Sequence, residues 1–337
     1  MISTDGVSGQ ASVPGMEKNK FPKLLNSLQV DITGASPDDA HKNHDDCNGL
    51  QPLVYPFAGR KQAQVEAQDF ERLHPNQFLN DNLISLYNRF LEDHLYRRKE
   101  RARVFFFNTY FYTALTNCAQ RETIVFDRVK KWTRNVDIFS YDYVVVPINQ
   151  SMHWYAAIIC NLPSLQEVSK TASGSKDKSK SYNDHQNAKL QEPVIITFDS
   201  LNKDRLSTVR NLRQYLSEEA KSKKGIEINT KLISGLKAQA IPLQTNNSDC
   251  GLYLLAYIEK FAQNPDWFIS RLLRKDMDLQ TDWPPLTSSD LRLRMSKFLT
   301  DLRDEQVQFS HGQKQGELMA DRWPVSFLLG ETNQTTI

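Results

Sequence analysis

The sequence lacks several features that would assign a chain to a functional class at once. Its 337 residues hold 42 Lys and Arg against 40 Asp and Glu, a formal net charge of +2 at pH 7. This balance gives no electrostatic reason to expect direct binding to nucleic acid. No apolar run approaches the roughly 20 residues of a membrane-spanning helix, and residues 1–6 do not resemble a secretory signal. We therefore expect neither a nucleic acid nor a membrane as a partner.

Cysteine is scarce, and its spacing excludes two kinds of site. The cysteines are far apart in the chain and form no Cys-x-x-Cys pair: Cys47, Cys118, Cys160 and Cys250. Such spacing fits neither a disulfide framework nor a structural zinc site. We expect no metal, no cofactor and a reducing compartment, cytosol or nucleus.

Apolar periodicity is missing at both ends and in one internal stretch, which defines the expected domain limits. Residues 1–50 are rich in Ser, Asp, Asn, Gly and Lys, a composition typical of a disordered tail. Residues 163–192 are dominated by Ser and Lys and are predicted to be a disordered surface insertion, which is tolerated because loop-closure entropy grows slowly with length. Residues 311–337 are predicted to be a C-terminal tail. A single folded domain is expected over residues 51–310, with no internal repeat.

The pattern inside that domain mixes strands and helices. Residues 141–148 and 153–160 have strand composition and flank a turn, so they predict an antiparallel hairpin with His153 at the start of the return strand. Residues 194–198 predict a third strand, which ends just before Asp199. A further strand is predicted within 226–233, and helices follow from helical apolar spacing near residues 81–95, 208–221, 250–261, 267–273 and 290–302.

The segment 244–251, Gln-Thr-Asn-Asn-Ser-Asp-Cys-Gly, precedes the most apolar of these helices. Residues such as Ser248 and Asp249 are typical helix caps, so Cys250 is predicted at the helix N-terminus. The helix dipole and the unpaired N–H groups there favour a thiolate, the nucleophilic form of cysteine. Taken alone, the same position also suits a buried structural cysteine that begins a core helix.

Cys250, His153 and Asp199 stand at the ends of apolar elements. A cysteine hydrolase needs this trio: the thiolate attacks a carbonyl, the imidazole protonates the leaving amine, and the carboxylate orients the imidazole. Gln244 and the backbone N–H of Cys250 would bind the oxyanion. Each residue alone has a simpler explanation, a packed histidine or a turn aspartate, so the assignment depends on the whole set.

The set resembles the SUMO-specific cysteine proteases, the sentrin or ubiquitin-like-protein protease family. The resemblance is carried by His153-Trp154, residues 198–201 (Phe-Asp-Ser-Leu), Gln244-x5-Cys250-Gly251, residues 78–81 (Phe-Leu-Asn-Asp), 129–133 and 136–139. It covers about residues 53–305. It implies an α+β, papain-like fold with a central, mostly antiparallel sheet packed against helices, and the chain order His, Asp, Cys.

The resemblance also implies an activity, which is thiol hydrolysis after the Gly-Gly C-terminus of SUMO in a precursor or a lysine isopeptide bond. The implied catalytic residues are Cys250, His153, Asp199 and Gln244. The implied substrate-binding residues are Trp154, Phe78, Asp81 and Gly251. In such a site the two aromatic rings would sandwich the glycines of the substrate, because any Cβ between them would clash.

Two features resemble the branch of the family that deconjugates SUMO and edits SUMO chains: Phe rather than Trp at position 78, and the insertion at 163–192. Members of that branch are usually longer proteins, so one interpretation is that this chain is a truncated version or a fragment of such a protein. A protease for another modifier such as NEDD8 and an inactive SUMO-binding module remain alternatives. Family likeness alone predicts the nucleus, with the cytoplasm second, and a monomer that binds SUMO and SUMO-conjugated proteins.

Overall fold

The computed structural model describes residues 51–97, 102–117, 124–165, 191–312 and 326–330, and all statements below concern these residues. The predicted tail at 1–50 and most of the predicted insertion at 163–192 lie outside them. Their disorder, and the domain limits that depend on it, therefore stay predictions.

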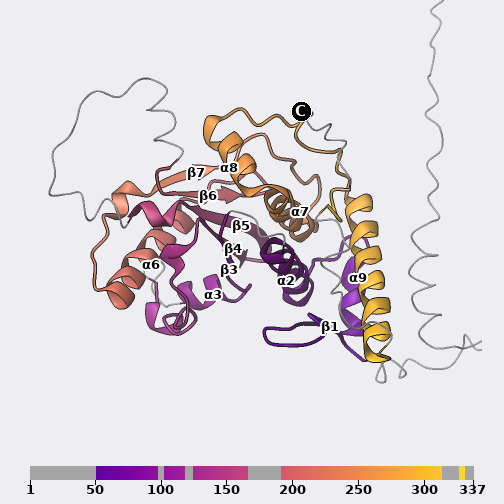
Figure 1. Ribbon diagram of the computed structural model, residues 1–337. Helices are drawn as coiled ribbons and strands as arrows, with labels where there is room; N and C mark the ends of the chain where they lie inside the picture. The colour runs from indigo at the N-terminus through magenta and orange to yellow at the C-terminus, as the bar shows by residue number, and fades with distance from the viewer. Residues whose placement is uncertain (1–50, 98–101, 118–123, 166–190, 313–325, 331–337) are drawn as a thin grey trace, which may run out of the picture. The chain divides into compact units, whose positions relative to one another are not determined.

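Helices and strands are interspersed along the described chain (Figure 1). The elements are β1 (Leu53–Tyr55), β2 (Ala63–Val65), α2 (Asp81–Arg97), β3 (Val104–Phe106), α3 (Phe111–Thr116), β4 (Tyr143–Gln150), β5 (His153–Cys160), β6 (Val194–Phe198), α6 (Leu206–Lys224), β7 (Ser234–Lys237), α7 (Cys250–Gln263), α8 (Pro265–Arg274) and α9 (Ser288–Ser310). Short 3-10 helices lie between some of them. The predicted α+β class is confirmed.

Local sequence accounts for several helix ends. Asn80 caps α2, since its side-chain oxygen accepts the Leu83 N–H at 3.2 Å. Helix α6 ends at Gly225, whose φ of 65° lies in the left-handed region that glycine adopts without strain. Helix α8 begins with Asn264 as its cap and Pro265 in its first turn. These signals explain why the predicted helices form close to their expected positions.

The predicted hairpin is confirmed. Strands β4 and β5 pair antiparallel, and Gln150 lies opposite His153 in the last rung. Ser151 and Met152 form the two-residue turn with φ values of 54° and 60°, the conformation that matches the twist of a hairpin. The tight turn places His153 at the first position of β5.

The main sheet has the strand order β3-β4-β5-β6-β7. Its two central pairings are antiparallel, whereas the outer pairs β3-β4 and β6-β7 are parallel. The predicted antiparallel pairing thus forms the centre of the sheet, and the outer strands are parallel because α3 and α6 lie in the connections that bring these strands back in the same direction. Strand β7 also begins after the predicted stretch 226–233, since residues 230–232 form a 3-10 helix.

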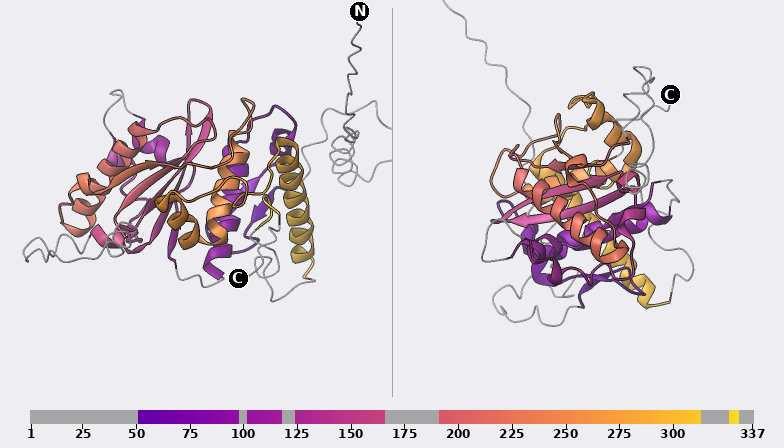
Figure 2. Two further views of the ribbon diagram at one scale, coloured as in Figure 1. Left: turned by 90° about the horizontal axis from the view of Figure 1, so that it is seen from above. Right: turned by 90° about the vertical axis from the view of Figure 1, so that its left-hand side faces the viewer.

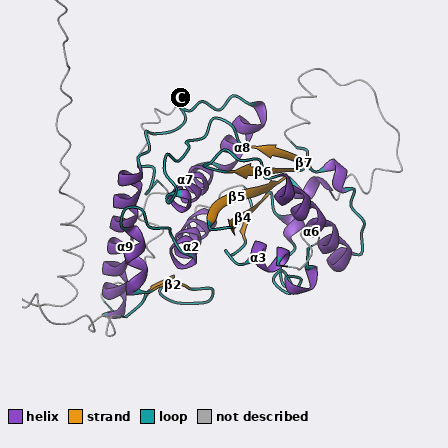
Figure 3. Cartoon of the chain, turned by 180° about the vertical axis from the view of Figure 1, so that it is seen from behind, coloured by secondary structure: helices purple, strands orange, loops and turns teal. Residues whose placement is uncertain are grey.

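Helices cover both faces of the sheet (Figures 1 and 2). Along β5 the side chains of Trp154, Ala156 and Ile158 join the core formed with α2, α7 and α9, while those of Tyr155 and Ala157 join the core formed with α3 and α6. This alternation is the period of two expected of a strand that is buried on both faces. Seen from behind, α9 lies beyond α2 and α7 on the side away from the sheet (Figure 3).

Part of the predicted C-terminal tail packs on this core. Leu328 and Leu329 are 0% and 2% exposed, and both backbone N–H groups donate to the carboxylate of Glu259 at 2.8 Å. Glu259 lies on α7 and is itself fully buried, where Tyr87 also donates to it. Residues 326–330 thus belong to the folded part of the chain, which the sequence did not predict.

We expect Leu328→Ala to lower the free energy of unfolding by about 2–4 kcal/mol, the usual cost of a cavity left by a buried leucine. Urea denaturation measures the change. Leu206→Ala is the matched control, because Leu206 is 79% exposed and should change stability by less than about 0.5 kcal/mol. Equal stability of the two variants would show that the 326–330 segment does not contribute to folding.

Candidate active site

His153 and Asp199 meet at one edge of the sheet. His153 begins β5 and Asp199 directly follows β6, and the two strands run antiparallel with Ala156 opposite Phe198. This register brings the start of β5 beside the end of β6. The Nε2 atom of His153 lies 2.8 Å from Oδ1 of Asp199.

The Asp199 carboxylate is held on both oxygens and its side chain is fully buried. Oδ1 also accepts the Leu201 N–H at 2.9 Å, and Oδ2 accepts the Arg205 Nε–H at 2.6 Å. Burial raises the pKa of Asp199, but the hydrogen bond from His153, that from Leu201 and the charge of Arg205 outweigh it, so the pKa lies below its usual value. Asp199 therefore stays ionised and can orient the imidazole.

Arg205 is a residue of the site that the sequence did not reveal. Its guanidinium carbon lies 3.9 Å above the centre of the Tyr155 ring, a cation–π contact that steadies it. The Tyr155 hydroxyl in turn hydrogen-bonds Thr208 at 2.8 Å and Gln150 at 2.9 Å. A lone arginine after a turn carries no recognisable pattern, so only the structure shows that it supports Asp199.

Cys250 is the first residue of α7, as predicted, and its side chain is buried. The Cys250 thiol lies close enough to His153 to raise the pKa of that imidazole. Burial lowers the pKa of His153, but its hydrogen bond with Asp199 and the neighbouring Cys250 thiol raise it by more, so the net pKa is above the usual value. A protonated imidazole beside a thiol at a helix N-terminus is the arrangement that favours a nucleophilic thiolate.

Gln244 is buried next to the same strand end. Its Oε1 accepts the Ser200 hydroxyl at 2.5 Å, its backbone N–H donates to the Ser200 carbonyl at 3.1 Å, and its Nε2 donates to the Asn246 carbonyl at 2.6 Å. The first two of these bonds hold Gln244 against Ser200, the residue that follows Asp199. The amide is thereby fixed in orientation between β6 and the start of α7.

The four predicted substrate-binding residues differ in exposure. Phe78 is 39% exposed, whereas the Trp154 ring is 1% exposed and its indole N–H donates to the Leu79 carbonyl at 2.8 Å. Gly251 packs against Leu79 so closely that a Cβ on Gly251 would lie 2.9 Å from the Leu79 Cβ. Asp81 begins α2 and is half-buried. Leu79 therefore joins the Phe78 segment directly to the Cys250 turn and to Trp154.

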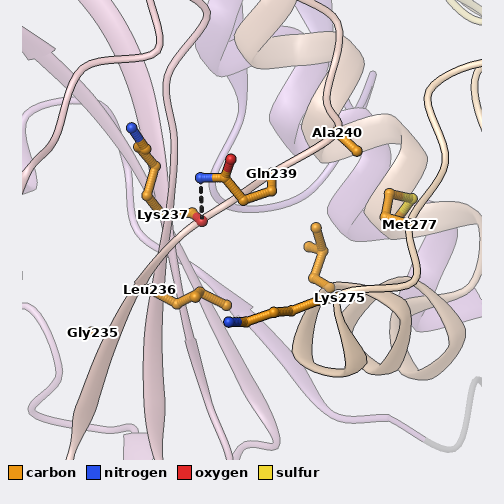
Figure 4. A pocket seen from close by; sticks show the side chains of 8 residues that line it. Gly235, Leu236, Lys237, Gln239, Ala240, Lys275 and Met277 are labelled. Atoms are coloured by element: carbon orange, nitrogen blue, oxygen red, sulfur yellow. Dashed lines mark hydrogen bonds between the residues drawn. The ribbon is translucent and has the colours of Figure 1, made fainter.

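Other features of the described residues lie apart from this set. No cluster of His, Cys, Asp and Glu in the described ranges is suited to hold a metal ion, and none of the helices described there is long and apolar enough to cross a bilayer. A cavity of about 380 Å³ lies between β7 and α8 (Figure 4) and is lined by residues 235–237, Gln239, Ala240, Leu272, Lys275 and Met277. It shares no residue with the predicted site.

The sequence and fold match known proteins. Residues 77–282 match the family described as Ulp1 protease family, C-terminal catalytic domain. The chain is 35% identical over 236 residues to ubiquitin-like-specific protease 2 of Schizosaccharomyces pombe, covering 67% of this chain and 37% of that protein. It is 32% identical over 285 residues to sentrin-specific protease 7 of Mus musculus, covering 68% of this chain and 27% of that protein. The chain thus spans about a third of the length of these relatives.

A solved structure of a de-sumoylating protease has a similar fold, with a TM-score of 0.59 and 24% sequence identity over 78% of this chain and 95% of that chain. The resemblance seen in the sequence is confirmed, since the matched region contains every residue of the predicted site. The chain belongs to the Ulp1 family of cysteine proteases.

Proposed function

We propose that the chain is a SUMO isopeptidase, which hydrolyses the bond after the Gly-Gly C-terminus of SUMO and releases it from lysine conjugates and SUMO chains. The observation that carries the proposal is the convergence of Cys250, His153 and Asp199 at one sheet edge. The names of the matched relatives, ubiquitin-like-specific and sentrin-specific proteases, support the substrate.

The chemistry follows from the roles that the geometry allows. The Cys250 thiolate adds to the carbonyl of the terminal glycine, and His153 gives its proton to the lysine amine as the isopeptide bond breaks. The resulting thioester is then hydrolysed by water, whose proton His153 accepts. Asp199, whose second oxygen is held by Arg205, keeps the imidazole aligned and stabilises its charged form.

Charge that develops on the carbonyl oxygen needs donors fixed in advance. The backbone N–H of Cys250 at the start of α7 is one, and the Gln244 amide is the other. Gln244 is suited to this because Ser200 and Asn246 already hold its side chain, so little reorganisation is needed in the transition state.

Substrate selection is assigned to the residues around Leu79. The exposed Phe78 ring offers one wall for the glycines of the substrate. Trp154, which the family resemblance assigns to the other wall, is 1% exposed, and its indole N–H donates to the Leu79 carbonyl. Gly251 leaves room for Leu79 beside the nucleophile, and Asp81 presents a carboxylate at the rim. A side chain larger than hydrogen at the last two substrate positions would clash between the rings.

Localisation and assembly are inferred from the family alone: we place the protein in the nucleus, with the cytoplasm second, as a monomer bound to SUMO-conjugated proteins. The NEDD8 alternative is not favoured by the names of the relatives. An inactive binding module is disfavoured because each catalytic position holds a competent residue.

The experiment that tests the function compares cleavage of poly-SUMO chains, a SUMO precursor and a NEDD8 precursor, each with wild type and Cys250→Ser. We expect fast cleavage of the chains, slower maturation of the SUMO precursor and little action on NEDD8. The Cys250→Ser variant should bind SUMO without turnover. Preferred cleavage of NEDD8 would overturn the substrate, and turnover by Cys250→Ser would overturn the nucleophile.

The charge of Asp199 should set the alkaline limb of the pH profile. Asp199 raises the pKa of His153, so in Asp199→Asn the imidazole loses its proton at a lower pH. We expect kcat/KM to fall by at least about 10²-fold and its alkaline limb to move to lower pH. Rates from pH 5 to 10 measure this, and an unmoved limb would argue against the ion pair.

A further inference from the structure

Arg292 is a buried guanidinium that binds two separate segments of the chain. It lies on α9, is 2% exposed, and donates to the backbone carbonyls of Arg72 at 3.0 Å, His74 at 2.8 Å and Gln77 at 2.8 Å. The same guanidinium forms a buried ion pair with Asp249. A buried charge is costly unless it is paired and hydrogen-bonded, and here several acceptors surround it.

Both segments that Arg292 holds lead directly into the site. Gln77 precedes Phe78, the exposed ring assigned to the substrate glycines, and Asp249 precedes Cys250. Beyond these points the segments touch again, because Leu79 packs on Gly251. Arg292 therefore helps to set the distance between Phe78 and Cys250, because it binds the residue that precedes each of them.

The Asp249 side chain serves this link instead of capping the helix. It occupies the N-cap position of α7 yet makes no cap hydrogen bond, which corrects the sequence-based expectation of a cap. Its carboxylate accepts from Asn246 at 2.6 Å and pairs with Arg292. Burial raises the pKa of Asp249, but hydrogen bonds with Ser288 and Asn246 and the charge of Arg292 lower it by more. The carboxylate thus remains a charged partner for Arg292.

We propose that Arg292 is a positioning residue of the active site: it holds the Phe78 segment in register with Cys250, so that a bound glycine carbonyl reaches the thiolate. The proposal rests on the proposed function for its substrate, but the link itself rests on the contacts of Arg292. Arginine is required because its planar fork reaches several acceptors at once, whereas lysine supplies a single point of charge on a flexible stem.

The test compares Arg292→Lys with Arg294→Lys. Arg294 is a matched control, since it also lies on α9 and donates to a backbone carbonyl, that of Leu328 at 2.8 Å, but in a segment outside the site. With a SUMO–amine fluorogenic substrate we expect Arg292→Lys to lower kcat/KM by about 10–100-fold, mainly through KM, as a small misplacement of a binding wall does. Arg294→Lys should stay within about threefold of wild type.

Two readouts do not depend on turnover. Hydrogen exchange in peptides covering residues 72–79 should accelerate in Arg292→Lys and not in Arg294→Lys. Alkylation of Cys250 by iodoacetamide should remain within about twofold of wild type in both, because the His153 contact is intact, whereas general unfolding would change it. If Arg292→Lys does not fold, Asp249→Asn removes the same ion pair with little change in volume, and the same loss of kcat/KM is expected.

Equal losses of activity in the Arg292 and Arg294 variants would overturn the proposal, because Arg292 would then only support α9. Unchanged exchange at residues 72–79 would also overturn it. If wild type cleaves no SUMO substrate while the exchange difference persists, the proposed function fails and the link between the two segments stands.

Discussion

The burial of helix α7 is the constraint on which the site depends. Every residue from Cys250 to Ala262 is buried, and α7 packs against β5 on one side and α2 on another. A helix enclosed in this way cannot shift without opening cavities that cost about 2–5 kcal/mol for each large side chain. The proposed nucleophile, Cys250, therefore sits on a rigid element, and β5 carries His153 to it. Cys250 differs from Cys160 mainly in its location. Cys160 is also buried, but it lies at the end of β5 opposite to His153.

Asp199 in the site and Asp249 beside Cys250 are each held by an arginine from a helical region. Arg205, just before α6, fixes Asp199, and Arg292 on α9 fixes Asp249. Buried ion pairs add little net stability, because desolvation offsets their attraction. Their value here is geometric: each guanidinium fixes the direction of one carboxylate, one supporting His153 and the other supporting the turn that leads to Cys250.

Local elements were predictable from the sequence, and long-range partners were not. Strand composition and a turn located the hairpin and the third strand, and cap-type residues located the start of α7, although the Asp249 side chain makes no cap hydrogen bond there. That His153, Asp199 and Cys250 meet came from the family resemblance, because spacing alone does not place strand ends in space. The parallel pairing of β3 with β4 and of β7 with β6 depends on the crossover connections that contain α3 and α6. Arg205 and Arg292 were missed because a guanidinium that binds a distant carboxylate or carbonyl leaves no periodic signal.

The most direct test of the central claim is to react the protein with SUMO that carries a C-terminal vinyl sulfone and to map the modified residue by peptide mass spectrometry. We predict a single adduct on Cys250, slowed strongly by His153→Ala, absent in Cys250→Ala and unchanged in Cys160→Ala. An adduct on another cysteine, or no adduct with the wild-type chain, would contradict the assignment of Cys250 as a SUMO-directed nucleophile.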